Sequence, residues 1–282
     1  MASSFSGKVA VVTGAGSGIG RQLALGLARR GARVAACDVN EAGLAETAGL
    51  LKDQGAEPHT AQLDVSDRQA VLDYAAAVAA HFGVVHQVYN NAGISGGGRG
   101  VLDTEWEVYD RVLGVNLMGV INGTKAFLPH LIASGDGHVV NVSSLNGVFA
   151  QPTLSAYCAS KFGVRGFTET LRAEMLAEKL PVKVTVVHPG GVKTNIASAN
   201  LQAAKQLGIE LSKTDQLRIR TYNEKLLRMP ADQAARIILD GVAAGKGRVL
   251  VGNDAKLLDQ AVRLVPSLHA RLSVLLERVL FR

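Results

Sequence analysis

The sequence predicts an α/β fold: a doubly wound parallel sheet of about seven strands, with helices on both faces and a C-terminal helical extension. Short apolar runs alternate with helical patterns from residue 8 to residue 189, which is typical of a parallel sheet. The chain has 282 residues, of which 48% are hydrophobic and 19% charged, so it can bury a full core. No linker or internal repeat divides this region, so we expect a single domain.

The individual elements follow from the spacing of apolar residues. The predicted strands cover residues 8–13, 33–37, 57–62, 86–90, 137–143, 182–188 and 248–251. The predicted helices cover residues 18–30, 41–54, 67–81, 105–133, 155–179 and 231–244. In the first helix, Ile19, Leu23 and Leu27 recur at helical spacing and so form its buried face. Right-handed crossovers between the parallel strands then place helices on both faces.

Residues 190–230 interrupt this alternation because they contain no clear strand. Ser212 is a candidate N-cap for a helix that runs to Leu226. An insertion of this length within a domain predicts a substrate-binding loop or lid. We expect Pro230 to lie in the first turn of the helix that follows.

Residues 253–282 form the predicted C-terminal helical extension, which is interrupted near Pro266. Leucines and valines recur along it, interspersed with Arg263, Arg271, Arg278 and Arg282. We expect this extension to pack against another subunit or to cover a pocket. The alternative is peripheral contact with a membrane, with the arginines facing the headgroups.

The charge and composition limit the possible partners and compartments. The net charge of +6 comes from the last third, since residues 190–230 and 245–282 each carry 7 basic and 3 acidic side chains. We expect solvated helix faces there, with attraction of an anionic substrate or a membrane surface as alternatives. The absence of a recognised motif excludes nucleic acid as a partner. Two cysteines, no membrane-length apolar run and no signal peptide predict a cytoplasmic protein, and we expect no metal site.

The first predicted strand leads into a glycine-rich turn, Thr13–Gly20, with the sequence Thr-Gly-Ala-Gly-Ser-Gly-Ile-Gly. Glycines let the backbone approach a pyrophosphate, and the N-terminus of the following helix supplies N–H donors. The spacing is G-x-x-x-G-x-G rather than the general G-x-G-x-x-G, so an ordinary tight turn is the alternative. The candidate cofactor-binding residues of this turn are Gly14, Ser17, Gly18, Ile19 and Gly20.

Asp38 strengthens the interpretation as a dinucleotide site. It ends the second strand, 18 residues after Gly20, where a carboxylate bonds the 2′-hydroxyl of an adenosine ribose. A carboxylate at this position repels a 2′-phosphate, so we expect NAD rather than NADP. An exposed aspartate at a strand end is the alternative.

Further polar and small residues follow the third and fourth strands. Asp64, followed by Val65, either bonds the adenine amino group or caps the next helix. The fourth strand ends in Asn90, Asn91, Ala92 and Gly93, whose small size lets the chain pass close to a cofactor. Asn90 has the alternative role of joining neighbouring strands.

Tyr157 and Lys161 lie four residues apart at the start of a predicted helix, so they share one face. A tyrosine with its usual pKa of about 10 is a poor acid–base group at neutral pH. A nearby ammonium stabilises the phenolate and lowers the pKa of Tyr157. A shift of about 3 units needs about 4 kcal/mol, which a lysine and a positive nicotinamide can supply in a dry site. An ordinary helix pair is the alternative.

Two further residues complete the predicted catalytic set. Ser144 lies 13 residues before Tyr157, at a strand end, where its hydroxyl can donate to a substrate oxygen; Ser143 is the competing candidate. Asn116 interrupts an apolar stretch of a predicted helix, which is unfavourable unless its side chain is hydrogen-bonded. It either holds a water in a proton relay or satisfies backbone groups.

Together these residues resemble the short-chain dehydrogenase/reductase family, whose members use NAD(P). The match in order and spacing comprises Thr13–Gly20, Asp38, Asp64, Asn90–Gly93, Asn116, Ser144, Tyr157 and Lys161. Pro189–Thr194, which reads Pro-Gly-Gly-Val-Lys-Thr, is similar to the family's Pro-Gly-x-Val-x-Thr segment. The resemblance covers about residues 6–252 and implies a Rossmann-type dinucleotide-binding and catalytic domain over residues 1–252, followed by the extension at 253–282.

The resemblance also implies a role for each residue. Tyr157 is the general acid–base, Lys161 lowers its pKa and holds the nicotinamide ribose, and Ser144 orients the substrate. Asn116 anchors the relay water. The cofactor-binding residues beside the nicotinamide are Pro189, Gly190, Val192 and Thr194. The family further implies a homodimer or homotetramer, often formed through the helices at 105–133 and 155–179.

The candidate substrate-binding residues are mostly apolar. They are Ser144, Leu145, Phe149, Tyr157 and Gly191, with Val148, His188 and the 195–228 loop as further candidates, although we expect a structural role for His188. These residues predict hydride transfer between NAD(H) and a hydrophobic secondary alcohol or ketone, such as a steroid, retinoid, aryl or medium-chain compound. Reduction of 3-oxoacyl thioesters of CoA or an acyl carrier is the alternative. A non-catalytic nucleotide-binding regulator is the third possibility.

Overall fold

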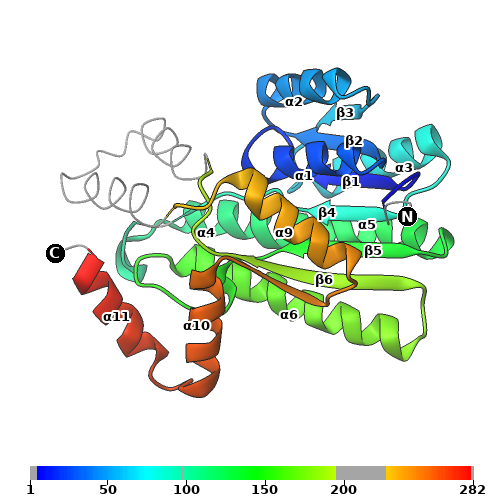
Figure 1. Cartoon of the computed structure of the whole chain (residues 1–282). Helices are drawn as coiled ribbons and strands as arrows, with labels where there is room; N and C mark the ends of the chain where they lie inside the picture. Colours follow the sequence, from blue (N-terminus) through cyan, green and yellow to red (C-terminus); the bar gives the residue numbers. More distant parts are fainter. Residues whose placement is uncertain (1–4, 97, 195–226, 281–282) are drawn as a thin grey trace.

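The computed structural model describes residues 5–96, 98–194 and 227–280 (Figure 1). A parallel sheet of seven strands runs through it, in the order β3-β2-β1-β4-β5-β6-β7. The order reverses between β1 and β4, which is the point where doubly wound sheets bind ligands at the carboxyl ends of their strands. The predicted fold class is confirmed.

The observed elements agree with the predicted ones to within a few residues. The strands are β1 (Val9–Thr13), β2 (Arg33–Asp38), β3 (His59–Gln62), β4 (Gln87–Asn90), β5 (Gly137–Val142), β6 (Val182–Pro189) and β7 (Arg248–Val251). The helices are α1 (Gly18–Arg29), α2 (Glu41–Asp53), α3 (Arg68–Phe82), α4 (Trp106–Leu113), α5 (Gly119–Ala133), α6 (Ser155–Ala177), α9 (Ala231–Ala243), α10 (Asn253–Leu264) and α11 (His269–Leu280). Short helical turns add η1 (Val101–Asp103), η2 (Gly114–Met118) and η3 (Leu145–Gly147).

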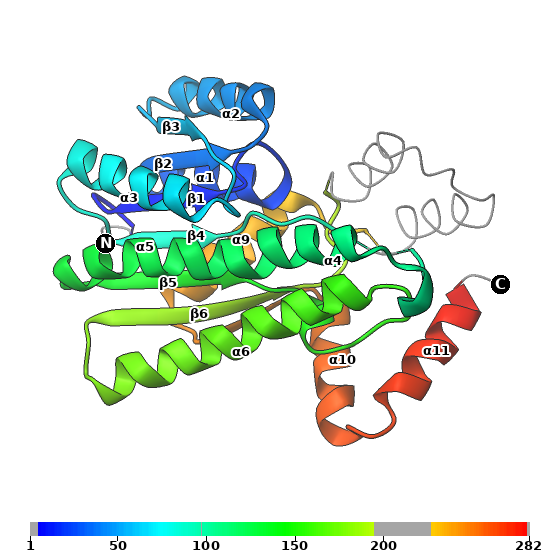
Figure 2. The same ribbon diagram turned by 180° about the vertical axis from the view of Figure 1, so that it is seen from behind.

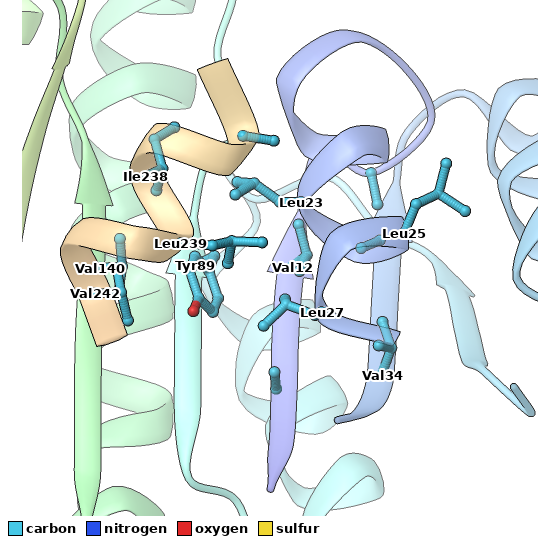
Figure 3. Packing of buried hydrophobic residues seen from close by; sticks show 14 of the residues in the cluster. Val12, Leu23, Leu25, Leu27, Val34, Tyr89, Val140, Ile238, Leu239 and Val242 are labelled. Carbon is cyan, nitrogen blue, oxygen red and sulfur yellow. The ribbon is translucent and has the colours of Figure 1, made fainter. Parts of the chain in front are cut away.

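Helices cover both faces of the sheet, as Figures 1 and 2 show from opposite sides. On one face, Leu23 and Leu27 of α1 gather with Leu239 of α9 over the strands (Figure 3). On the other face, side chains of α3, α5 and α6 form a second apolar cluster. Burial on both faces explains why the strands carry nearly continuous apolar runs.

The long helix predicted at 105–133 is divided in the structure by one turn of π-helix, η2, between α4 and α5. Asn116 lies in this turn, where its side chain binds the backbone of Ile94, 22 residues earlier. A single π-helical turn inside an α-helix often marks a functional site. Apolar periodicity cannot reveal it, because the helix continues in nearly the same direction on both sides.

Two smaller boundaries also differ from the prediction. Pro230 is the N-cap residue of α9 and so lies just before its first turn, not within it. Helix α3 is capped by Asp67, whose side chain accepts from the Ala70 N–H, so Asp64 is not its cap. Ser212 and residues 195–226 of the predicted loop lie outside the described residues.

The C-terminal extension begins with α10, which packs on the domain. Asp259 of α10 is buried and pairs with Arg248 of β7 and with Arg263 on its own helix. The predicted interruption near Pro266 is confirmed, since α10 ends at Leu264 and α11 begins at His269. Packing against another subunit stays a prediction. In the described part of the chain, no helix combines the length and apolarity that crossing a membrane requires.

Candidate active site

The glycine-rich turn, Thr13–Gly20, connects β1 to α1 at the carboxyl edge of the sheet. Gly14 has a φ of +66°, and a Cβ on it would lie 2.7 Å from the Ala92 Cα. A Cβ on Gly20 would lie 2.0 Å from the Gly14 oxygen. Only glycine therefore fits at these two positions, so the motif has a steric reason in this structure.

Side chains from the end of β4 hold the glycine-rich turn in place. The Asn91 amide donates to the carbonyl oxygens of Thr13 and Gly14, at 3.0 and 3.3 Å. The Thr13 hydroxyl oxygen accepts from the backbone N–H groups of Asn91 and Ala92, each at 3.0 Å. The first and fourth strands are thereby joined where the sheet order reverses. Sequence reasoning gave Thr13 no role of its own, although it begins the motif.

The first turn of α1 fits a pyrophosphate. Ser17 occupies the N-cap but makes no side-chain hydrogen bond to the helix, and the first turn contains no acidic residue. The N–H groups of Gly18, Ile19 and Gly20 and the positive end of the helix dipole therefore remain available to an anion. Together with the glycine cradle, this end of α1 has the features that a dinucleotide requires.

Asp38 lies directly beside the glycine-rich turn. One carboxylate oxygen accepts from the Gly16 N–H at 2.8 Å and the other from the Asn40 N–H at 2.8 Å. These bonds fix the carboxylate at the end of β2, where the sequence predicted contact with a ribose. Sequence reasoning missed Arg21, whose guanidinium pairs with both oxygens of Glu46 (2.7 and 2.8 Å) and donates to the Gly16 carbonyl.

Asp64, Val65 and Asn90 are engaged in contacts within the protein. One Asp64 oxygen accepts from the N–H and the hydroxyl of Ser66, so its exposed carboxylate forms a local turn. The Val65 carbonyl accepts from the Asn122 amide on α5 at 3.1 Å. Asn90 donates to Asn141 of β5 at 2.8 Å, which confirms the alternative role of joining neighbouring strands. Contact of Asp64 and Val65 with a cofactor stays a prediction.

Tyr157 and Lys161 lie on one face of α6, as their spacing predicted. The Lys161 Nζ lies 5.8 Å from the centroid of the Tyr157 ring and donates to the Val142 carbonyl at 3.0 Å. Lys161 is 3% exposed, and this burial lowers the pKa of its ammonium to about 8. Tyr157 is half-buried. A buried cation thus lies beside a tyrosine at the carboxyl edge of the sheet.

Asn116 and Gly93 reach the same point from two other elements. A Cβ on Gly93 would lie 3.2 Å from Asn116 Oδ1 and 3.4 Å from Lys161 Nζ. The Asn116 side chain accepts from the Ile94 N–H and donates to the Ile94 carbonyl, both at 2.8 Å, and to the Ser160 hydroxyl at 3.1 Å. It therefore satisfies backbone groups, one of the two expected roles, and the relay water stays a prediction.

The structure distinguishes the two candidate serines. The Ser143 hydroxyl donates to the Lys161 carbonyl at 2.8 Å, which gives it a structural role. The Ser144 hydroxyl oxygen accepts from the Asn146 N–H at 3.1 Å, which leaves its own proton free to donate to a substrate. His188 is buried, and its Nδ1 lies 2.8 Å from the Ser144 carbonyl. Burial lowers the pKa of His188 to about 4, so it is neutral near pH 7 and donates this bond.

The nicotinamide segment, which we define as Pro189–Thr194, crosses towards the glycine-rich turn. A Cβ on Gly18 would lie 3.3 Å from the Thr194 side chain. The Gly190 N–H donates to the Val251 carbonyl at 2.9 Å, and Val192 is buried. The two motifs, far apart in the sequence, thus face each other at the carboxyl edge.

The candidate substrate-binding residues differ in how open they are. Leu145 and Gly191 are partly exposed, whereas Phe149 is 1% and Val148 3% exposed. Both buried side chains belong to the protein interior in this structure, and their contact with a substrate stays a prediction. Residues 195–226 of the predicted loop lie outside the described residues.

Comparison with known proteins agrees with this geometry. Residues 8–205, more than half of the chain, match the family model described as short chain dehydrogenase. SadH of Mycobacterium tuberculosis (strain ATCC 25618 / H37Rv), which is named as an oxidoreductase, is 51% identical over 270 residues, covering 96% of this chain and 95% of that protein. Epidermal retinol dehydrogenase 2 of Mus musculus is 40% identical over 193 residues, covering 68% of this chain and 62% of that protein.

A solved structure extends the similarity to the whole fold. The crystal structure of a short chain dehydrogenase/reductase from Burkholderia phymatum in complex with NAD has a TM-score of 0.86 to this chain at 30% identity. The similarity covers 94% of this chain and 96% of that one. The present chain therefore belongs to the short-chain dehydrogenase/reductase family of oxidoreductases.

Proposed function

We propose that this chain transfers a hydride between NAD(H) and a hydrophobic secondary alcohol or ketone. The observation that carries the proposal is the buried ammonium of Lys161, 5.8 Å from the Tyr157 ring centroid. In the described residues no carboxylate forms an ion pair with it, and only desolvation shifts its pKa. A buried cation without a counterion is unfavourable, and a phenolate at Tyr157 supplies the missing negative charge.

Proton transfer is the part of the reaction that the protein performs. In alcohol oxidation, the Tyr157 oxygen accepts the hydroxyl proton of the substrate, and in ketone reduction it returns that proton to the carbonyl oxygen. The Ser144 hydroxyl donates to the same substrate oxygen and so orients it. The Lys161 ammonium compensates the charge on Tyr157 during both steps. Bound NAD supplies the group that accepts or donates the hydride.

We further propose NAD as the preferred cofactor. The Asp38 carboxylate is fixed beside the glycine-rich turn by the N–H groups of Gly16 and Asn40, where it would repel a 2′-phosphate. The neighbouring guanidinium of Arg21 is neutralised by Glu46, so it is poorly suited to bind that phosphate. Both charges therefore favour the cofactor that lacks the phosphate.

The apolar side chain of Leu145, which follows Ser144 after β5 and is partly exposed, supports a hydrophobic substrate. The similarity to a protein named retinol dehydrogenase supports a large apolar substrate, although retinol itself is a primary alcohol. The physiological substrate is then a secondary alcohol or ketone with a large apolar body.

The proposal is tested by measuring nicotinamide reduction through its absorbance. The assay uses NAD or NADP with a panel of steroid, aryl and medium-chain secondary alcohols. We expect turnover with NAD, and loss of about 10³-fold or more in kcat for Tyr157→Phe while NADH binding persists. Full activity of Tyr157→Phe would contradict the mechanism. Turnover only with 3-oxoacyl thioesters, measured in parallel as oxidation of NADH or NADPH, would overturn the substrate class.

A further inference from the structure

We propose that Asp254, the second residue of the C-terminal helical extension, is a positioning residue that holds the nicotinamide segment (Pro189–Thr194) in its cofactor-binding conformation. The inference rests on the proposed function, because that function assigns this segment to the cofactor. It gives the extension a role in the active site. The evidence lies in the contacts between α10 and the end of β6.

The Asp254 carboxylate makes a direct hydrogen bond to the nicotinamide segment. Its Oδ2 accepts from the Gly191 N–H at 2.6 Å, a short N–H···O hydrogen bond. Gly191 lies 63 residues before Asp254 in the sequence, so the contact is made by the fold and not by local chain geometry.

Two glycines make room for this carboxylate. A Cβ on Gly190 would lie 2.3 Å from each of the two Asp254 carboxylate oxygens, far inside contact distance. Gly252 has a φ of +106°, and a Cβ on it would lie 2.3 Å from Asp254 Oδ1. Glycine at both positions lets the exposed Asp254 carboxylate approach the backbone of the segment closely.

The neighbouring backbone fixes the other side of the same residue. The Gly191 carbonyl accepts from the N–H groups of Arg228 and Met229, at 3.0 and 3.1 Å. The Lys193 N–H donates to the Met229 carbonyl at 2.8 Å. The carbonyl of Gly191 is therefore held by Arg228 and Met229, and Asp254 is the acceptor for the N–H of the same residue. Without it, the Gly190–Gly191 peptide keeps the bond on its carbonyl oxygen, which accepts from the Val192 N–H at 2.9 Å, but loses the bond on its N–H.

This arrangement predicts a loss of cofactor affinity when the acceptor is removed. Asp254→Ala removes the hydrogen bond, and we expect the Kd for NADH, measured by fluorescence titration, to rise about tenfold. The KM for NAD should rise by a similar factor, while kcat at saturating NAD falls less than about threefold. Asp254→Asn keeps an oxygen acceptor, so its Kd should stay within about threefold of the wild-type value.

Asp232→Ala is the matched control. Asp232 is also an exposed acid in the first turn of a helix, α9, and it pairs only with exposed Arg236 among the described contacts. This substitution removes the same charge without touching the nicotinamide segment, so the Kd for NADH should not change. Thermal unfolding of each variant checks that the fold is retained.

A double-variant comparison separates positioning from general weakening. Gly190→Ala in the wild type places a methyl group against the Asp254 carboxylate, and should weaken NADH binding more than tenfold. In the Asp254→Ala background this clash is absent, so the same change should weaken binding by a smaller factor. Lower stability of Asp254→Ala does not affect this comparison, because the single and double variants that give the second factor both carry Asp254→Ala.

The outcomes distinguish this inference from the proposed function. If the wild type binds NADH but Asp254→Ala binds it equally well, Asp254 has no positioning role and the inference is overturned. If the wild type binds no NADH, the proposed function itself fails. Equal weakening by Asp254→Ala and Asp232→Ala would assign the effect to net charge, and would also overturn the inference.

Discussion

The two sides of the predicted cofactor site are built in different ways. On one side, the glycine-rich turn is shaped by steric necessity, since Gly14 and Gly20 admit no Cβ. On the other side, the nicotinamide segment is shaped mainly by hydrogen bonds from β7, from Met229 and from Asp254. A side chain at either glycine should abolish the conformation of the turn, whereas loss of one hydrogen bond should only partly destabilise the nicotinamide segment. The first side should therefore decide whether the dinucleotide binds, and the second how it is aligned.

The proposed acid–base groups lie next to the glycine-rich side. A Cβ on Gly93, which follows β4, would lie within contact distance of Asn116 and Lys161, so the proposed catalytic residues adjoin the end of that side. Variants of these regions should therefore differ in what they impair: binding of the dinucleotide, proton transfer, or alignment of the bound dinucleotide.

Lys161→Met should have the largest effect. Loss of the buried ammonium removes the α6 cation that stabilises the Tyr157 phenolate, so we expect kcat for alcohol oxidation near pH 7 to fall about 10³-fold. An opposite charge within a few Å shifts ionisation by about 1–3 units, so the pH–rate profile of the residual activity should move that far to the alkaline side. Steady-state rates across a pH series check this. A profile that does not move would show that Lys161 does not act on Tyr157.

Gly20→Ala should come next, as a loss of binding. Its Cβ would lie 2.0 Å from the Gly14 oxygen and 2.5 Å from Asn91 Nδ2, so the turn cannot keep its conformation. We expect the Kd for NADH to rise at least about 100-fold, which corresponds to about 2.7 kcal/mol. Gly49→Ala is the control, since its Cβ would meet nothing within 4 Å and lies within helix α2. It should leave binding unchanged and raise stability by up to about 1 kcal/mol.

The smallest of these three effects should be a change of cofactor preference on the glycine-rich side. Asp38→Ala combined with Val39→Arg removes the carboxylate and adds a cation at a position that is 63% exposed. We expect the ratio of kcat/KM for NAD to that for NADP to fall about 100-fold, with Val39→Arg alone giving a smaller change. An unchanged ratio would mean that Asp38 does not face the adenosine ribose.

The sequence predicted those features whose cause is local. Alternating apolar runs and helical patterns are local, and the elements predicted within the described residues were found with small shifts at their ends, except that the helix at 105–133 is divided by a π-helical turn. Tyr157 and Lys161 were predictable because four residues on a helix form one face. The glycine-rich turn was predictable for the same reason, since its strand and helix are adjacent in the chain.

Features that depend on distant contacts were not predictable. The π-helical turn at Asn116 accompanies the pairing of its side chain with Ile94, a contact made across the site. Ser143 and Ser144 were separated only when the structure showed that Ser143 donates to the Lys161 carbonyl. In the sequence, Asp254 is one residue of a predicted helix, and its partner Gly191 lies 63 positions away. Nothing in its neighbourhood of the sequence indicates that contact.

Hydrogen–deuterium exchange of the wild-type protein, with and without NADH, tests the central claim most directly. The claim is that one dinucleotide lies between the two sides of the site. We predict that NADH slows amide exchange both in Gly14–Gly20 and in Pro189–Thr194, because both segments become ordered around one ligand. Slower exchange in the glycine-rich turn alone, with Pro189–Thr194 unchanged at saturating NADH, would contradict the account.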